Sequence, residues 1–408
     1  MKVLLINNFH YRKGGSETVY FNTGRLLSEN GHEVVWFAFD DPQNLPCSQP
    51  HTFADRPHRL SGITGYFYNR KVSRALDEFI EAEKPDIAHV HLIWGGMTPS
   101  IFKPLQKRGI PLVHTVHDYR MICPAYTFRD GSGRICEQCR GGKYFNCVRN
   151  RCSKGSFVKS LMMAAEMYFR NTWFKPVNNI DGFIFVSKFS RDKHFELQPS
   201  FRDKPGRVIY NSFPLSDIPV VEDGGYYLYY GRLSHEKGVS TLIYVAALRP
   251  SVKFKIVGTG PLENELRSRV TSLGLDNIEF LGYKTGEELY SVVRNASFVV
   301  VPSEWYETLG MTIVEPYSFG RPVIAASIGG ITEIVRDGDT GFLFESGNRD
   351  SLLDAIDRSL ALTPEMKAEM SGKAYDFFLK HFTDDIYISE VMSFYKEIID
   401  SYIVRDVR

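Results

Sequence analysis

Two successive blocks of short apolar runs, separated by amphipathic segments, constrain the fold of this chain more than any other feature. The first block has strand-like runs at Val3–Asn7, Val34–Phe39, Asp86–His91, Leu112–Val116 and Phe183–Val186. After a turn-rich stretch, Asn211–Gly225, similar runs recur at Tyr226–Tyr230, Lys253–Val257, Asn277–Phe280, Phe298–Val301, Pro322–Ala325 and Phe342–Phe344. Strands that alternate with helices form parallel sheets with crossover connections. The sequence therefore predicts two α/β domains in series.

The length of 408 residues is sufficient for two domains, each with a core of its own. The longest stretch without Asp, Glu, Lys or Arg is Ile87–Phe102, which contains two His, two Gly and a Pro. We therefore expect no transmembrane helix. The first residues offer only four apolar side chains before two Asn, too short a run for a secretory signal. These features predict a cytoplasmic protein.

Charge is distributed unevenly, although the net charge is only +1. Residues 1–207 contain 30 Lys and Arg against 19 Asp and Glu, whereas the remainder contains 19 against 29. Much of the excess lies in Tyr119–Lys159, with nine basic and two acidic residues. A basic first half favours contact with anionic material such as phospholipid, nucleic acid or a phosphorylated substrate. The alternative is a solvated surface of unequal charge.

Two loops at the ends of predicted strands carry groups suited to a phosphorylated ligand. Gly14 and Gly15 lie between the first strand and the first helix, where a helix N-terminus offers N–H groups to phosphate. Arg232 and Lys237 follow the first strand of the second domain, and two cations on such a loop suit a diphosphate. A tight turn and a solvated surface loop, respectively, are the alternatives.

A third motif places two glutamates, Glu307 and Glu315, around the start of a predicted helix. Gly310 lies at its first turn, where backbone N–H groups can meet a phosphate. Carboxylates beside an anion site are unfavourable unless they accept hydrogen bonds from a hydroxyl-rich ligand such as ribose or hexose. For either glutamate alone, a surface charge near a helix end is the alternative.

Together these motifs resemble those of the family 4 retaining glycosyltransferases. The matching segments are Gly-Gly-Ser-Glu at 14–17, Gly-Arg-Leu to Glu-Lys-Gly at 231–238, Val257–Pro261, Phe280–Gly282, the two glutamates, and the run from Arg321 to Val335. The resemblance covers nearly the whole chain. It implies an α/β GT-B fold, with two facing Rossmann-like domains and a C-terminal helix that crosses back to the first.

The resemblance also implies domain boundaries. Residues 1–210 with 383–408 would form the acceptor-binding domain, and 222–382 the nucleotide-sugar-binding domain. Within the first, 119–155 is a basic, Cys-rich insert that follows the His-Asp-Tyr sequence, as in a subgroup of the family.

The same resemblance implies roles in binding the donor. Arg232 and Lys237 would clamp the diphosphate, Glu315 would bind the ribose, and Glu307 would face hydroxyl groups of the donor sugar. The backbone N–H groups expected at the phosphates belong to Gly14, Gly15, Leu309, Gly310 and Met311. No catalytic metal is implied.

At the acceptor side, His117 matches the family histidine that ends a strand facing the sugar. Asp118 beside it would serve the acceptor hydroxyl. The chain departs from the family in one place, since Pro316 follows Glu315 where the family usually has Ala. Proline disfavours helical geometry at the preceding residue, so the orientation of Glu315 is a point for the structure to decide.

The activity implied is transfer of a hexose from a UDP- or GDP-sugar to a saccharide, as in cell-surface polysaccharide biosynthesis. One alternative is a nucleotide-sugar 2-epimerase of the same fold, which would need no acceptor. Another is a nucleic-acid-binding module built on the basic insert. It would leave the donor-site motifs without a purpose, so we do not expect a nucleic-acid partner.

Four cysteines of the insert, Cys136, Cys139, Cys147 and Cys152, have the spacing of a compact zinc loop. Thiolate ligation could organise a segment with little apolar content. The spacing therefore predicts a structural zinc site, with free thiols or a disulfide as the alternatives.

The segment after the insert, Ser156–Phe174, is predicted to be a helix with an apolar stripe. Burial against the sheet of its own domain is the commoner explanation for such a stripe. However, the stripe is wide and follows a basic segment, a combination that suits an anionic membrane surface. We therefore predict peripheral binding at the inner membrane face and a lipid-linked saccharide acceptor, with a soluble phosphorylated acceptor as the alternative.

Overall fold

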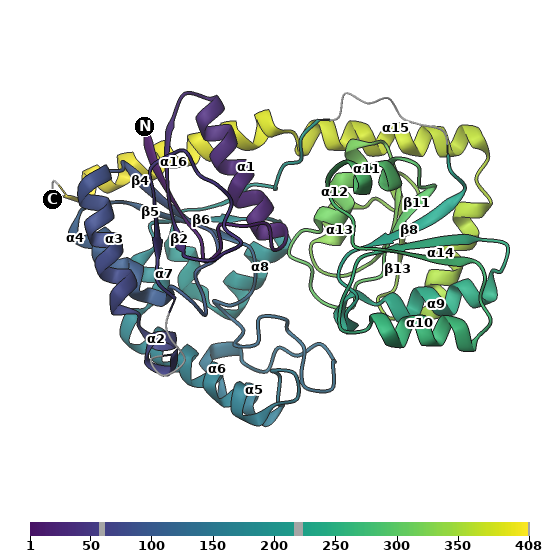
Figure 1. Cartoon of the computed structure of the whole chain (residues 1–408), viewed down its shortest axis with the longest axis horizontal. Helices are drawn as coiled ribbons and strands as arrows, with labels where there is room; N and C mark the ends of the chain where they lie inside the picture. The colour runs from purple at the N-terminus through teal and green to yellow at the C-terminus, as the bar shows by residue number, and fades with distance from the viewer. Residues whose placement is uncertain (57–61, 216–222, 407–408) are drawn as a thin grey trace. The chain divides into compact units, whose positions relative to one another are not determined.

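The structure of the protein, a computed structural model, describes residues 1–56, 62–215 and 223–406. The chain divides into two compact units (Figure 1). Unit 1 contains Met1–Ile209 and the chain from Tyr387 onward, and unit 2 contains Tyr210–Ile386. Each unit is built on one parallel sheet. The predicted fold class of two α/β domains is therefore confirmed.

The sheet of unit 1 has seven strands in the order β3-β2-β1-β4-β5-β6-β7, all parallel. These strands are β1 (Lys2–Ile6), β2 (Glu33–Phe39), β3 (His51–Ala54), β4 (Ile87–Val90), β5 (Leu112–Val116), β6 (Gly182–Phe185) and β7 (Gly206–Val208). The helices are α1 (Gly15–Glu29), α2 (Gly62–Phe67), α3 (Arg70–Glu83), α4 (Phe102–Lys107), α5 (Phe145–Arg149), α6 (Phe157–Phe169), α7 (Pro176–Asn179), α8 (Lys188–Leu197) and α16 (Asp384–Asp406). Strand order reverses between β1 and β4, the place where open parallel sheets bind ligands.

The C-terminal helix α16 is part of the core of unit 1. Its apolar side chains share one cluster with residues of β1, β2 and α1. Gly182 at the start of β6 allows this approach, because a Cβ there would lie 2.5 Å from the Cδ1 atom of Ile398. Polar contacts add to the packing, since the Tyr387 hydroxyl lies 2.7 Å from that of Thr23.

The sheet of unit 2 has six parallel strands in the order β10-β9-β8-β11-β12-β13. They are β8 (Tyr226–Tyr230), β9 (Lys253–Val257), β10 (Ile278–Gly282), β11 (Phe298–Val301), β12 (Val323–Ala326) and β13 (Gly341–Phe344). The helices are α9 (Val239–Leu248), α10 (Glu263–Ser272), α11 (Gly286–Arg294), α12 (Met311–Ser318), α13 (Ile331–Ile334), α14 (Arg349–Leu360) and α15 (Pro364–His381). Here the order reverses between β8 and β11.

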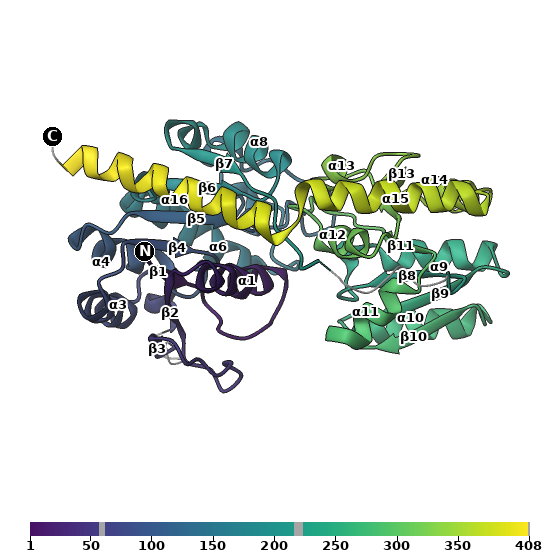
Figure 2. The same cartoon turned by 90° about the horizontal axis from the view of Figure 1, so that it is seen from above.

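Helices cover both faces of the unit 2 sheet (Figures 1 and 2). Side chains of α9, α10 and α14 form one buried cluster with the sheet, which includes Leu242, Leu266 and Leu352. Because this core is fixed on its own, the loops at the carboxyl ends of β8 and β11 are attached to a rigid support.

The structure adds two strands that the sequence did not predict, β3 and β7, both at edges of the unit 1 sheet. The helix predicted over Ser156–Phe174 ends earlier, at Phe169, and a π-turn at Arg170–Phe174 follows. Within residues 1–56, 62–215 and 223–406, no helix is both long and apolar enough to cross a membrane.

Candidate functional site

In unit 2, the predicted donor residues meet at the point where strand order reverses. Lys237 lies in a short 3-10 helix (His235–Lys237) after β8, and Glu307 lies in the loop after β11. The Lys237 Nζ atom lies 2.6 Å from the Glu307 Oε1 atom, and the Ser303 hydroxyl donates to the same oxygen at 2.7 Å. Glu307 is 7% exposed. Burial acts to raise its pKa, but Lys237 and Ser303 outweigh burial and hold the pKa below its ordinary value.

Glycines bring these loops into contact. Gly238 has a left-handed φ of 68°, and a Cβ there would lie 1.8 Å from the Pro302 carbonyl oxygen at the end of β11. On the other side, Gly330 donates its N–H to the Glu307 carbonyl at 2.8 Å, and a Cβ at Gly329 would lie 2.6 Å from that oxygen. The position of the Lys237–Glu307 pair is therefore fixed by backbone contacts that a side chain would prevent.

Glu315 also lies at this edge of the sheet, near the middle of α12. The hydroxyl of Tyr230, the last residue of β8, donates to its Oε2 atom at 3.0 Å. Burial raises the pKa of Glu315 to about 7, and the hydrogen bond from Tyr230 lowers it only in part. Although Pro316 lies inside α12, the helix continues to Ser318. The carboxyl group of Glu315 is therefore directed toward β8.

The other predicted donor residues take positions around this pair. Leu309 is buried, and Gly310, with a left-handed φ of 102°, precedes α12, which begins at Met311. Arg232 follows β8 and its side chain is exposed. A small cavity is lined by Tyr230, Lys237 and Ser303 among others. Unit 2 thus carries cations, carboxylates and the start of a helix at the carboxyl ends of β8 and β11. This set of groups suits a ligand with phosphate and hydroxyl groups.

In unit 1, His117 and Asp118 follow β5, and both are held by neighbours. The rings of His117 and His91 share a hydrogen bond of 2.9 Å between Nε2 and Nδ1. Burial lowers the pKa of His117 to about 3, so its imidazole is neutral near pH 7. Asp118 accepts from the Arg120 backbone N–H at 2.9 Å and pairs with the Arg120 side chain at 3.0 Å. Burial raises the pKa of Asp118, and Arg120 offsets part of that effect.

Unit 1 also contains a cavity of about 460 Å³ at the reversal point between β1 and β4. Gly14 lines it and caps α1, which begins at Gly15. Its other lining residues include three cations, one carboxylate and a tryptophan: Lys13, Arg56, Arg120, Glu17 and Trp94. The size is within the range of small-molecule sites.

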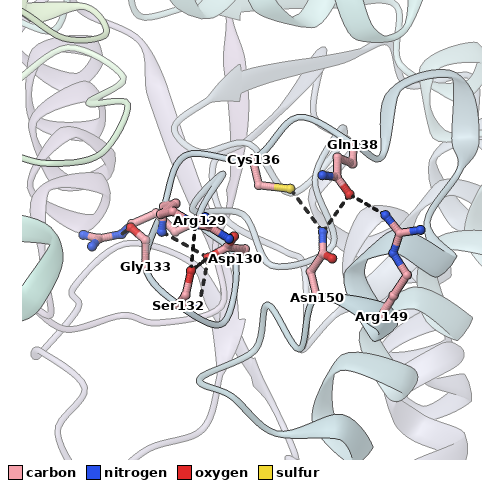
Figure 3. Close-up of polar contacts among 9 residues, drawn as sticks. Arg129, Asp130, Ser132, Gly133, Cys136, Gln138, Arg149 and Asn150 are labelled. Atoms are coloured by element: carbon pink, nitrogen blue, oxygen red, sulfur yellow. Dashed lines mark hydrogen bonds and ion pairs between the residues drawn. The ribbon is translucent and has the colours of Figure 1, made fainter.

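The Cys-rich insert is organised by polar contacts of its own (Figure 3). The side-chain oxygen of Gln138 accepts from Asn150 at 2.9 Å and from Arg149 at 3.2 Å. Nearby, Asp130 closes a turn by accepting from the Ser132 N–H at 2.9 Å. These bonds hold the two turns of the segment in a defined shape.

The structural zinc site expected at the four cysteines of this insert stays a prediction. In the parts of the chain that the structure describes, which include all four cysteines, no group of three or more His, Cys, Asp or Glu side chains could hold a metal ion. The Cys147 thiol hydrogen-bonds to Cys152, which also contacts Cys136. Cys139 packs against an apolar cluster that includes Tyr144, and burial together with the neighbouring Cys152 and Cys136 raises the pKa of its thiol to about 12. All six cysteines are free.

The apolar stripe of α6 faces outward, contrary to the commoner explanation. Ser160, Ala164 and Met167 form its buried side. The exposed large apolar residues of this region are Phe145, Phe157, Val158, Leu161, Met162, Tyr168 and Trp173. In Figure 1, α5 and α6 extend beyond the strands of unit 1 on the side away from α16.

Sequence reasoning missed the residues that hold the predicted ones. Ser303 and Tyr230 bond the two donor-site carboxylates, and His91 bonds His117. The only feature of the sequence that could have pointed to these three residues is that each one ends, or closely follows, a predicted strand. The Gly329–Gly330 pair stood in a quoted motif without an assigned role.

Two parallel α/β sheets, with such a constellation at the carboxyl edge of one, define the class of nucleotide-sugar-dependent transferases with the GT-B fold. Family models agree: "Glycosyltransferase Family 4" matches residues 13–217, and "Glycosyl transferases group 1" matches residues 216–377. The chain belongs to the glycosyltransferases.

Similar proteins span nearly the full length. An uncharacterized glycosyltransferase of Methanocaldococcus jannaschii is 30% identical and aligns over 91% of both chains. An uncharacterized 42.6 kDa protein in the cps region of Klebsiella pneumoniae is 26% identical over 82% of this chain and 88% of its own. The structure of Anabaena HepE with UDP and glucose has a TM-score of 0.69 at 18% identity, over 97% of this chain and 100% of that one. This likeness establishes the GT-B fold.

Proposed function

We propose that this chain is a retaining glycosyltransferase that transfers a hexose from a UDP- or GDP-sugar to a saccharide. The Lys237–Glu307 pair carries the proposal, because it sets a cation and a buried carboxylate side by side at a strand edge. A diphosphate would be met by Lys237 and Arg232, and sugar hydroxyls by Glu307. Glu315 would accept hydrogen bonds from the ribose. UDP and glucose bound to the structurally similar HepE support a nucleotide-sugar donor.

In the proposed reaction, the bond between the sugar C1 atom and the diphosphate oxygen breaks, and a bond from C1 to the acceptor oxygen forms on the same face. The leaving diphosphate gains negative charge, which Lys237, Arg232 and the start of α12 would stabilise. The acceptor proton passes to the leaving phosphate oxygen. This route needs no separate base, which agrees with the low basicity of neutral His117.

Mass spectrometry after incubation with a panel of UDP- and GDP-sugars, with and without saccharide acceptors, tests the proposal. We expect release of nucleoside diphosphate and a product whose anomeric configuration, read by NMR, matches the donor. An epimerised nucleotide-sugar formed without acceptor would instead identify a 2-epimerase. An inverted product would overturn the retaining mechanism.

We also propose that the protein is cytoplasmic, binds the inner membrane face and acts on a lipid-linked saccharide in cell-surface polysaccharide biosynthesis. The outward apolar side of α6 and the π-turn after it supports this, since Val158 in α6 and Trp173 in the turn are 73% and 69% exposed. Lys154 and Lys175 flank this segment, Lys159 lies within α6, and such cations suit anionic headgroups. The Klebsiella relative from a cps region supports a polysaccharide product.

A further inference from the structure

The cavity of unit 1 has a composition that the proposed donor chemistry does not explain. It lies where β1 and β4 end, and its walls come from the loops after these strands together with residues of β2, α2 and the segments after β3 and β5. Its cationic side chains are Lys13, Arg56 and Arg120, and its one acidic side chain is Glu17. We propose that this cavity binds the acceptor through a sugar unit that carries an acidic group, a carboxylate or a phosphate. The inference rests on the proposed function, because it defines the chemistry of that acceptor.

The cations are gathered although they repel one another. The Lys13 Nζ atom lies 3.7 Å from the centre of the Phe9 ring, and the Arg56 guanidinium lies 5.3 Å from the same centre. Burial lowers the pKa of Lys13; the charges of Glu17 and Asp41 offset part of this effect, and those of Arg56 and Arg120 add to it. An anion in the cavity would remove this repulsion.

The two arginines retain donors for such an anion. Arg56 pairs with Asp41 at 2.7 Å, and Arg120 pairs with Asp118 at 3.0 Å. Arg120 also donates to the Trp94 carbonyl at 2.9 Å. A guanidinium has five N–H groups, so these contacts leave others available. Both side chains remain in part exposed, and a ligand can therefore reach them.

Glu17 indicates that the same ligand has hydroxyl groups. This residue is 2% exposed, and its Oε1 atom has no hydrogen-bond partner among the described residues. A buried carboxylate oxygen without a donor is unfavourable. A sugar hydroxyl would supply the donor. The three cations would bind an acidic group, and Glu17 would bind a hydroxyl group. An acidic saccharide offers both, whereas a neutral sugar or a simple anion offers only one.

The floor of the cavity is rigid before any ligand binds. Asn8 accepts from the Met97 N–H at 3.1 Å and donates to the Trp94 carbonyl at 3.2 Å. A Cβ at Gly96 would lie 2.5 Å from the Asn8 Oδ1 atom, so the loop after β4 packs directly on that side chain. Phe9, Phe39 and Tyr66 add apolar wall that the C–H face of a sugar ring can cover.

Binding of three probes to the full chain without nucleotide tests the proposal: glucuronate, glucose 6-phosphate and glucose, each followed by ligand-observed NMR. We expect both acids to bind at least about tenfold more tightly than glucose. The stronger of the two acids distinguishes a carboxylate site from a phosphate site. Equal binding of glucose and the acids would overturn the proposal.

Charge-removing variants locate the site. K13Q and R56Q should each weaken binding of the acids about tenfold while leaving the Kd for UDP within twofold. K84Q is the matched control, since exposed Lys84 ends α3 at the opposite edge of the sheet. Loss of UDP affinity instead would assign the cations to the donor site. An equal effect of K84Q would show that the acids are attracted by the overall positive charge of unit 1 and not by the cavity, which would overturn the proposal. If no nucleotide-sugar is turned over, the proposed function fails, yet the probe titration still decides the cavity.

Discussion

The ion pair between Lys237 and Glu307 serves both donor binding and fold stability, because Lys237 also compensates the buried charge of Glu307. Glu307 is buried, so removing Lys237 leaves its carboxylate without the cation that pairs with it at 2.6 Å. Breaking such a pair from one side costs about 3–5 kcal/mol. K237A should therefore destabilise the fold as well as weaken donor binding.

We predict that K237A lowers transfer about 10²–10³-fold and also lowers the melting temperature. The double variant K237M/E307Q, which removes both charges, should recover most of the stability and none of the activity. Calorimetry and a transfer assay on the same preparations check this. Near-wild-type turnover of K237A would contradict the donor-site assignment.

Glu315 gives the donor site a group that titrates near neutrality. Its pKa of about 7 means that the carboxyl is mostly protonated at pH 6 and mostly ionised at pH 8. Because the ionised form accepts hydrogen bonds from ribose hydroxyls better, UDP affinity should rise about tenfold over this range. Titration calorimetry measures it. UDP itself also titrates, so E315Q is the control: an equally steep profile in E315Q would show that Glu315 is not the ribose ligand.

At this scale, the sequence predicted the groups but not their partners. Lys237, Glu307 and Glu315 could be predicted because each belongs to a motif that follows a predicted strand, and the motifs occur in the order typical of the family. Ser303 and Tyr230 could not, because their contacts depend on how the loop after β11 and the helix α12 lie against β8.

Among the elements, α6 shows what periodicity leaves open. The apolar stripe predicted a helix correctly, but a stripe does not reveal what covers it. The edge strands β3 and β7 were missed for a different reason, since they have four and three residues and only one neighbour each. In the insert, the Cys spacing fits zinc, free thiols and disulfides alike. Only the folded loop shows which thiols meet: Cys147 hydrogen-bonds to Cys152, and Cys152 contacts Cys136.

We predict that replacing Val158 and Trp173 together by Ser reduces binding to anionic vesicles at least about tenfold, because each exposed side chain contributes about 1.5–3 kcal/mol on burial. Co-sedimentation with vesicles of increasing phosphatidylglycerol content measures this, and binding should weaken with salt. Leu273→Ser is the matched control, since Leu273 is similarly exposed in unit 2. If the wild-type chain fails to bind anionic vesicles even at low salt, the membrane proposal is wrong and a soluble acceptor is favoured.

For the molecule as a whole, the stabilities of the two units depend differently on pH. Nine of the 11 histidines precede residue 210. Burial lowers the pKa of His114 to about 3 and that of His194 to about 4. These groups are neutral in the folded state but take up protons below about pH 6.5 when unfolded. Their contribution to stability is complete above that pH and is lost as pH falls toward 3–4.

Glu315 in unit 2 acts in the opposite sense, because its pKa is raised. Its contribution to stability is present below about pH 4.5 and is lost as pH rises through 7.

We therefore predict that acidification from pH 7.5 to 5 destabilises unit 1 and leaves unit 2 unchanged or slightly more stable. Each such histidine costs about 1.4 kcal/mol per pH unit below pH 6.5, which corresponds to a fall of a few degrees in the melting temperature of a domain of this size. Hydrogen exchange of peptides from each unit measures the two responses separately. In H194F, which removes one buried imidazole at similar volume, the acid sensitivity of unit 1 should decrease. Equal destabilisation of both units, or an H194F variant as acid-sensitive as the wild type, would show that the buried histidines are not the cause.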